Sequence, residues 1–323
     1  MGSPATTEKL KYFDLYSENS NDLDEIVTGM SKIEKSISPK FFYDEKGLNI
    51  IDAVYELPEY YLTRTEKQIL SEAKEEICRL IGKDSIIIEP GSGNSEKVRP
   101  FLNELNPKSY VPMDFSIDYL KKVAESLHKE YPELELYVVC TDYVHHFQLP
   151  DQLPEGKRVV FFPGSTLGNL EPNEVVTFLQ SLAKGLGKGG GLLIGIDLQK
   201  DKEVVELAYN DPQGVCKAFY LNVFDRLNAE YGANFQADNF QYQVYYNEEF
   251  ARVEKYFVSN QNQTINIGSH FFKLEADESI RAENSYKFTV DQFHALAETV
   301  GFSPVRLWTD PLQLFSVHYL EVL

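Results

Sequence analysis

The amino-acid sequence predicts an α/β fold with a parallel β-sheet. Between residues 85 and 197, short runs of β-branched and apolar residues alternate with amphipathic helical runs. This alternation implies strands joined by crossover helices, and the apolar content suits strands that are covered on both faces. We predict the strands at residues 85–89, 109–114, 134–139, 158–162 and 191–197.

The helices around these strands have recognisable starts and stops. The segment SIDYLKKVAESLHKEY places apolar residues at helical spacing, with Ser116 as its N-cap. A second helix is started by Pro172 and stopped by glycines. Upstream of the sheet, the sequence TRTE at residues 63–66 matches a capping box. It predicts a helix that runs to about Ile81 and stops at Gly82.

The pattern changes after Asp197. Residues 203–232 have a helical pattern, and residues 240–275 alternate as antiparallel strands do. The last stretch, from residue 285, has the pattern strand, helix, strand, strand, which we interpret as the close of the parallel sheet. The predicted division is one domain from residues 61–202 and 286–323, and a second, α+β, substrate-binding domain from residues 1–60 and 203–285.

The charge and composition exclude several classes of partner. The 323 residues include 50 acidic and 31 basic ones, a formal net charge of −19, which repels phosphate backbones and anionic lipids. The three cysteines show no C-x-x-C spacing, and the pair His145 and His146 has no third ligand at zinc spacing. No apolar run is long enough to span a membrane. We therefore expect a cytoplasmic monomer that binds neither nucleic acid, membrane nor metal.

The segment IIIEPGSGNSEKVRP, residues 86–100, carries a strand into a glycine-containing loop. Gly91 and Gly93 let the backbone turn tightly and approach a ligand where a Cβ atom would collide. The spacing lacks the third glycine of a dinucleotide fingerprint, and Pro100 disturbs any helix that begins at Ser95. A pyrophosphate site, and with it a nicotinamide-dependent oxidoreductase, is disfavoured. An ordinary βα turn is the alternative interpretation of the loop.

Acidic residues stand at the ends of three predicted strands. Glu89 and Asp114 suit a ligand with a cation near the loop and a ribose beyond it. S-adenosylmethionine has both, together with a carboxylate that suits Lys97. Asp142 is placed to accept a hydrogen bond from the exocyclic amine of adenine, with Tyr143 beside it to cover the ring. Three strand ends thus supply three suitable partners for one ligand.

Several distinctive segments resemble one enzyme family. They are PKFFYDEKGLNIIDAVYELPEYYLTRTE, EPGSGNSEKVRPFL, YVPMDFS, FFPGSTLGNLEP and LAYNDPQGVCKAFYLNV. Through them the chain resembles, over nearly its whole length, the histidine-specific S-adenosylmethionine-dependent Nα-methyltransferases of the ergothioneine pathway. The resemblance implies a Rossmann-like class I methyltransferase sheet and the transfer of three methyl groups to the α-amine of L-histidine, which gives hercynine.

The resemblance also implies a role for individual residues. For the cofactor it implies Gly91 and Lys97 at the methionine end, Asp114 at the ribose, and Asp142 with Tyr143 at the adenine. The residues that it implies around the substrate are Asn169 and Tyr209 at the carboxylate, Tyr60, Glu283 and Ser285 at the imidazole, Gly164 in the same pocket, and Tyr43 near the amine. Tyr43 and Asn169 are the implied catalytic residues.

Methyl transfer from a sulfonium needs a neutral amine and little covalent help from the protein, so positioning dominates. The tyrosines Tyr43, Tyr60 and Tyr61 are candidates to present π faces to an increasingly methylated cation, an interaction worth ~0.5–2 kcal/mol. The sequence shows no strong general base, so the proton of each amine is left to solvent.

One residue departs from the family pattern. In RVEKYF, Lys255 stands where an apolar residue, often methionine, is expected in bacterial members. A cation there would pair with Glu283 and alter which ring is accepted, so another aromatic amino acid or related amine is an alternative substrate. A cofactor-binding module without catalysis is a second alternative. Simpler interpretations of single residues are Asn169 as a helix cap and Glu283 as a solvent-facing partner of Lys287.

Overall fold

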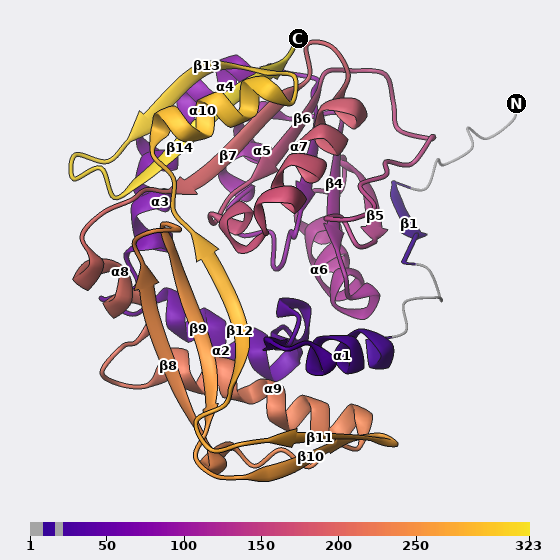
Figure 1. Cartoon of the computed structure of the whole chain (residues 1–323). Helices are drawn as coiled ribbons and strands as arrows, with labels where there is room; N and C mark the ends of the chain where they lie inside the picture. Colours follow the sequence, from indigo (N-terminus) through magenta and orange to yellow (C-terminus); the bar gives the residue numbers. More distant parts are fainter. Residues whose placement is uncertain (1–8, 17–21) are drawn as a thin grey trace, which may run out of the picture.

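The computed structural model describes residues 9–16 and 22–323, which form a larger and a smaller β-sheet, a separate two-stranded hairpin, and the helices that cover them (Figure 1). The larger sheet has eight strands. In their order across the sheet, these strands are β1 (Leu10–Asp14), β5 (Glu135–Cys140), β4 (Ser109–Asp114), β3 (Ile86–Pro90), β6 (Arg158–Phe162), β7 (Gly191–Asp197), β14 (Phe315–Val322) and β13 (Phe302–Thr309).

The predicted parallel sheet is confirmed. The strands from β1 to β7 in this order run parallel, and β14 runs antiparallel to both of its neighbours. The predicted bounds match those of β4, β6 and β7, and differ by one residue at each end of β3 and β5. Every residue of β3 and β7 is buried. Strands covered on both faces carry apolar residues along their whole length, which makes their ends easy to find in a sequence.

Helices cover both faces of the larger sheet. Ile87 of β3 points into the core on one face, whereas Ile86 and Ile88 point into the core on the other, as the alternation of side chains along a strand requires. The helices on the first face are α3 (Tyr61–Glu72), α4 (Lys74–Ile81), α5 (Arg99–Leu105) and α6 (Ile117–Glu130), and those on the second are α7 (Pro172–Leu186) and α10 (Val290–Thr299).

Three of the predicted helix ends are confirmed. Ser116 caps α6, because its Oγ accepts a hydrogen bond from the backbone N–H of Tyr119 at 3.4 Å. Pro172 is the first residue of α7. Gly82 follows α4 with a φ of 86°, a conformation that favours glycine.

The predicted capping box at residues 63–66 is wrong. Helix α3 begins at Tyr61, and the segment divides at Ala73 into α3 and α4. Glu66 does not reach back to the helix start, because its carboxylate is bonded to groups from two distant loops. The capping-box pattern was therefore misleading, because the partners of Glu66 lie far from it in the sequence.

The second group of elements surrounds a smaller sheet and has its own core, in which Phe42, Phe224 and Phe257 pack together. In order across the smaller sheet, the strands are β2 (Lys35–Ser36), β12 (Ser279–Tyr286), β9 (Arg252–Ser259) and β8 (Phe240–Asn247), and β10 (Gln263–Ile267) forms a separate hairpin with β11 (His270–Leu274). The helices of this group are α1 (Asp22–Ser31), η1 (Pro39–Phe42), α2 (Glu45–Tyr55), α8 (Lys202–Tyr209), α9 (Val215–Tyr231) and η3 (Ala237–Asn239).

Two strands differ from the predicted organisation. Although the prediction places residues 1–60 in the second domain, β1 pairs with β5 in the larger sheet. The strand at residue 285, expected to belong to the parallel sheet, is the end of β12, which pairs with β9 in the smaller sheet. Residues 1–8 and 17–21 of the predicted second domain lie outside the described residues. The division into two domains therefore stays a prediction.

The order of strands places a crevice at one edge of the larger sheet. From β3 the chain order runs through β4 to β5 on one side and through β6 to β7 on the other. Open α/β sheets bind ligands outside the carboxyl ends of the strands at such a switch point. Figure 1 shows the smaller sheet, α1, α2 and α9 beyond this edge. Within the described part of the chain, no helix is long and apolar enough to cross a membrane.

Candidate active site

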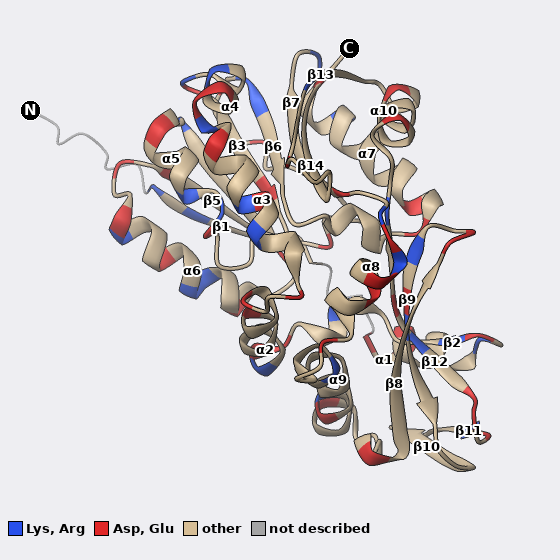
Figure 2. Cartoon of the chain, turned by 90° about the vertical axis from the view of Figure 1, so that its left-hand side faces the viewer, with Lys and Arg blue, Asp and Glu red and all other residues tan. Residues whose placement is uncertain are grey.

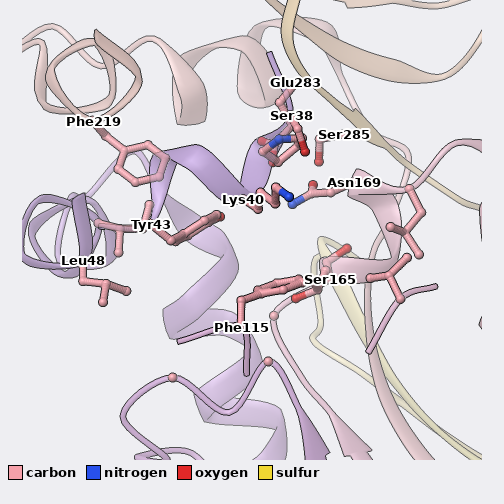
Figure 3. Close-up of a pocket in the computed structure, with 18 of the residues that line it drawn as sticks. Ser38, Lys40, Tyr43, Leu48, Phe115, Ser165, Asn169, Phe219, Glu283 and Ser285 are labelled. Carbon is pink, nitrogen blue, oxygen red and sulfur yellow. The ribbon is translucent and has the colours of Figure 1, made fainter. Parts of the chain in front are cut away.

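A cavity of about 740 Å³ lies between the carboxyl edge of the larger sheet and the smaller sheet. Figure 3 shows Glu283, Ser285 and Asn169 on one side of it, Tyr43 on another, and Phe115 beneath. Apart from Tyr61, every site residue that the sequence predicts lines this cavity: Tyr43, Tyr60, Glu89, Gly91, Gly93, Lys97, Asp114, Asp142, Tyr143, Gly164, Asn169, Tyr209, Glu283 and Ser285.

The glycine loop after β3 needs its glycines for two reasons. Gly91 has a φ of 66°, and a Cβ atom there would lie 2.7 Å from Tyr143 Oη. Gly93 has a φ of 50°, and its N–H donates to Asp114 Oδ2 at 3.2 Å. A Cβ atom on Gly93 would meet no atom within 4 Å. The loop therefore packs against Tyr143 on one side and leaves open space on the other.

Glu89 is a buried acid and Asp114 a half-buried acid at the edge of this open space. Glu89 is 2% exposed and contacts the hydroxyl of Tyr110. Burial raises its pKa to about 8, and burial also raises the pKa of Asp114. Neither carboxylate forms an ion pair with a described residue. A buried acid without a cation gains most from a ligand that brings a positive charge or hydroxyl donors.

Asp142 has a different environment. Its Oδ2 lies 2.9 Å from His145 Nδ1, and its Oδ1 accepts the backbone N–H groups of Val144 and His145. Burial opposes ionisation, but the hydrogen bond from His145 lowers the pKa of Asp142 overall. The same bond raises the pKa of His145 to about 10. Asp142 is thus an ionised carboxylate that its own turn already satisfies in part.

Lys97 is held in place by Glu66. Glu66 Oε2 lies 2.6 Å from Lys97 Nζ, and Glu66 Oε1 accepts the backbone N–H of Gly164 at 2.7 Å. The carboxylate is 1% exposed. Gly195 in β7 provides the room, because a Cβ atom there would collide with Glu66 Oε1. Glu66 thereby ties the loop after β3 to the loop after β6.

Asn169 is positioned at the cavity by close packing of its short helix against a strand of the smaller sheet. It ends the short helix η2 (Thr166–Asn169), which packs against β12. Gly168 permits this packing, because a Cβ atom there would lie 2.5 Å from the carbonyl oxygen of Tyr286. The interpretation of Asn169 as a helix cap is wrong, since Glu171 caps α7 in a capping box with Glu174. Figure 3 shows the amide of Asn169 directed into the cavity.

A buried ion pair lies behind Tyr209 and Ser285. Lys287 Nζ is 2.6 Å from Asp197 Oδ2, and it donates to Tyr209 Oη at 2.9 Å and to Ser285 Oγ at 3.0 Å. Both charged side chains are fully buried. Lys287 donates to both hydroxyl oxygens, so the hydroxyl protons of Tyr209 and Ser285 are not used in these bonds. Each hydroxyl can therefore donate to the other or to a ligand. Burial opposes ionisation of Asp197, but Lys287 and Lys200 lower its pKa overall.

Two sequence interpretations fail at this ion pair. Tyr61 does not present its ring to the cavity: it is 2% exposed, and its hydroxyl donates to Asp197 Oδ1 at 2.8 Å. Glu283 is not a solvent-facing partner of Lys287, because Glu283 is buried and Lys287 pairs with Asp197. Tyr61 and Lys287 serve a buried network that forms only when α3, β7 and β12 come together.

Glu283 pairs with Lys255 at the far end of the cavity. Its Oε2 lies 2.7 Å from Lys255 Nζ and accepts the hydroxyl of Tyr220 at 2.8 Å. The predicted pairing of Lys255 with Glu283 is confirmed. Lys255 Nζ also lies 4.5 Å from the ring centroid of Tyr209, a cation–π contact. Figure 2 shows basic and acidic segments together on β9 and β12.

The model of the family described as "Histidine-specific methyltransferase, SAM-dependent" matches residues 22–322. The chain belongs to this family. It is 35% identical to the histidine N-alpha-methyltransferase of Mycolicibacterium smegmatis over 91% of this chain and 92% of that protein. The protein of the same name from Mycobacterium tuberculosis is also 35% identical, over 88% of this chain and 90% of that protein. The ergothioneine biosynthesis protein 1 of Schizosaccharomyces pombe is 26% identical over 92% of this chain and 41% of that protein.

As a member of the histidine-specific methyltransferase family, the chain is an S-adenosylmethionine-dependent N-methyltransferase. The residues at the sheet edge fit that cofactor. Gly93 faces open space, Glu89 and Asp114 form no ion pair with a described residue, and Lys97 supplies an ammonium group. A sulfonium nucleoside that carries an amino-acid carboxylate has complementary groups for each of them.

The sequence analysis missed residues that position the site of this methyltransferase. Phe115 lines the cavity with its ring centroid 4.9 Å from that of Tyr143. Lys287 lies two residues after Ser285 and so shares its face of an extended strand. The sequence held an indication for both residues. Phe115 directly follows Asp114, the acid at the end of a predicted strand, and Lys287 falls on the same side of the alternating pattern as Ser285. The sequence held none for Glu66, because its partners Lys97 and Gly164 are far away in the sequence.

Proposed function

We propose that this protein transfers methyl groups from S-adenosylmethionine to the α-amine of L-histidine and forms hercynine. The observation that carries the proposal is one continuous cavity with Asn169, Tyr209 and Glu283 at its substrate end. At the sheet edge of this cavity lie acids, Glu89 and Asp114, that form no ion pair with a described residue. Such a cavity suits a cationic nucleoside at one end and an amino acid at the other. The two mycobacterial relatives, named for histidine, support the choice of amino acid.

At the cofactor end, the proposal gives each residue the part of the ligand that its chemistry suits. Asp114 accepts from the ribose hydroxyls, and Asp142 with Tyr143 holds the adenine. The residues proposed for the methionine portion are Glu89 for its positive charge, Lys97 for its carboxylate, and Gly91 and Gly93 for close approach of the backbone.

At the substrate end, the two ends of the amino acid are held separately. In the proposal Asn169 and Tyr209 bind the carboxylate, with the Lys287 ammonium 2.9 Å behind the Tyr209 hydroxyl. The residues proposed for the imidazole are Tyr60, Glu283 and Ser285, and Gly164 lines the same pocket. Tyr43 and Asn169 are proposed to keep the amine on the line of attack.

S-adenosylmethionine supplies an electrophilic methyl group, and the chain supplies position. Holding both ends of the substrate removes the entropy cost of orienting the amine for each transfer. Burial keeps the pKa of Tyr43 and Tyr60 well above the usual range, so both phenols stay protonated at neutral pH. We therefore assign the proton that leaves the amine before each transfer to solvent. The tyrosine rings favour the methylated cation by cation–π contact.

Mass spectrometry of the reaction mixture tests the proposal. Purified protein, S-adenosylmethionine and L-histidine are incubated, and three successive methyl increments on histidine are expected. The matched control is Asp114→Ala, which keeps the substrate end and impairs the cofactor end. Absence of any increment while the protein binds both ligands would contradict the enzyme and favour a cofactor-binding module without catalysis.

The Lys255–Glu283 pair favours one alternative, methylation of another aromatic amino acid or related amine. Competition between histidine, tryptophan and tyrosine in one mixture separates the two functions. Histidine is expected to be consumed first. Preferential methylation of another amino acid would replace the substrate and leave the reaction class unchanged.

The proposal includes a cytoplasmic monomer that acts on a small molecule. All proposed ligand-binding residues come from one chain, and the three cysteines are free thiols, as is usual in a reducing compartment. Light scattering at low protein concentration tests the monomer, and a stable dimer would overturn that part.

A further inference from the structure

The proposed ring-binding end of the cavity holds a buried cation beside its acid. The side chain of Lys255 is 0% exposed and that of Glu283 is 5% exposed. Lys255 Nζ and the hydroxyl of Tyr220 both donate to Glu283 Oε2. No described residue donates to Glu283 Oε1. Glu283 Oε2 is therefore hydrogen-bonded within the protein, and Glu283 Oε1 remains as an acceptor for a ligand.

The net charge of this pair decides which ligand the acceptor suits. A lone buried carboxylate would stabilise a positively charged ring strongly. With the Lys255 ammonium at 2.7 Å, the two charges cancel, and a cationic ring at Oε1 would also be repelled by the ammonium. An uncharged ring with an N–H group can donate to Oε1 without either cost.

We infer that the Lys255–Glu283 pair selects an uncharged ring that carries an N–H or O–H donor, so that histidine binds with a neutral imidazole. The inference rests on the proposed function and adds the protonation state of the substrate. Lys255 acts as a specificity-determining residue through Glu283 and touches no reacting atom.

The other titratable groups around the pair do not change charge near neutral pH. Burial raises the pKa of every tyrosine there and of the one thiol, so these groups stay uncharged, and Lys287 stays charged beside Asp197. Arg281, which also lines the cavity, carries a guanidinium group. The groups that face the pair are Tyr43 beside η1, Tyr55 of α2, Tyr209 of α8, Cys216 and Tyr220 of α9, Tyr242 of β8, and Lys287 next to β12.

Calorimetry of histidine binding at two pH values tests the inference, with S-adenosylhomocysteine at saturation. A free imidazole has a pKa of about 6.5, so its neutral fraction rises about tenfold from pH 5.5 to 7.5. The affinity of the unchanged protein for histidine is expected to rise by the same factor. In Lys255→Met the ratio is expected to fall to one or below, because an unpaired Glu283 favours the protonated ring.

A histidine analogue separates titration of the ring from titration of the protein. The ring of 1,2,4-triazole-3-alanine keeps an N–H group and stays uncharged over this pH range. Its affinity for the unchanged protein is expected to be the same at both pH values. A second readout is proton release at pH 5.5, measured in buffers of different ionisation enthalpy. It is expected for histidine and not for the analogue.

The outcomes distinguish this inference from the proposed function. Equal histidine affinity at the two pH values in the unchanged protein, or an unchanged ratio in Lys255→Met, would overturn the inference while histidine methylation stands. If neither histidine nor the triazole analogue binds at either pH and no methyl increment forms, the proposed function fails and the inference fails with it.

Discussion

At the cofactor end of the cavity, the buried Glu89 and the half-buried Asp114 form no ion pair with a described residue. At the substrate end, Glu283 and Asp197 each have a lysine ammonium within 2.7 Å. An unpaired buried carboxylate is unfavourable until a cation or hydroxyl donor arrives. A paired one is already satisfied and mainly fixes geometry. The acids of the first end should therefore govern ligand affinity, and those of the second should govern stability and selectivity.

The largest expected effect is on stability at the substrate end. Asp197→Asn leaves Lys287 and Lys200 without their shared carboxylate, and removing one partner of a buried ion pair costs about 4 kcal/mol. Urea unfolding without ligands measures the free energy. Asp225→Asn is the matched control, because it breaks the exposed ion pair with Lys46 and should cost about 0.5 kcal/mol. Similar losses in both variants would remove the distinction between the two ends.

The next effect is on affinity at the cofactor end. Asp114→Ala removes two hydrogen bonds to a charged acceptor, each worth about 1.5 kcal/mol, so the affinity for S-adenosylhomocysteine should fall about 100-fold. Calorimetry measures it. Asp118→Ala, an exposed acid in the first turn of α6, should leave the affinity unchanged. A loss below threefold in Asp114→Ala would contradict the proposed ribose contact.

A smaller, selective effect is expected at the substrate carboxylate. Tyr209→Phe keeps the ring beside Lys255 and removes the hydroxyl that Lys287 holds. Loss of this one hydrogen bond to a charged group should raise the KM for histidine about tenfold and leave the affinity for S-adenosylhomocysteine unchanged. Steady-state kinetics measures the first and calorimetry the second. Tyr246→Phe, at a buried tyrosine of β8 outside the cavity lining, is the control. Equal changes in both variants would point to packing and not to the carboxylate.

The smallest effect is a dependence of cofactor binding on pH. The pKa of Glu89 is raised to about 8 by burial, so the group is mostly protonated at pH 7 and must lose its proton to meet a positive charge. Affinity for S-adenosylmethionine should therefore rise about fivefold from pH 7 to 8, as the ionised fraction does. Calorimetry at both values checks it, and Glu89→Gln should abolish the rise. A persistent rise in the variant would assign it to another group.

The layout of the larger sheet is predictable because its central strands are buried on both faces and therefore appear in the sequence as continuous apolar runs. Strands β6 and β7 are correct at both ends for this reason. Strand β1 has no such continuous apolar run, since it is a partly exposed strand that pairs, among the described residues, only with β5. The prediction placed the end of β12 in the wrong sheet. Alternation of side chains along a strand indicates that one face is buried, but it does not identify the strand that lies beside it.

The cofactor end of the site is predictable from residues alone, because Glu89, Asp114 and Asp142 stand at successive strand ends. The substrate end depended on the resemblance to a family, since Tyr60, Asn169 and Glu283 come from separate elements. Glu66 shows the limit of local pattern: its position fits a capping box, yet its partners are Lys97 and the N–H of Gly164. The role of such a residue depends on partners that come close to it only in the folded chain.

Lys255 and Glu283 face each other directly across the register of β9 and β12. Neutralising either side chain alone would leave an isolated charge in a place that water scarcely reaches, whereas replacing both together by an apolar couple would not. A change at one of the two positions therefore alters the charge that the other presents to the ring, with little shielding by solvent. A shift in which ring is accepted can arise at this pair alone, while the carboxylate anchors and the methyl-donor edge are inherited intact.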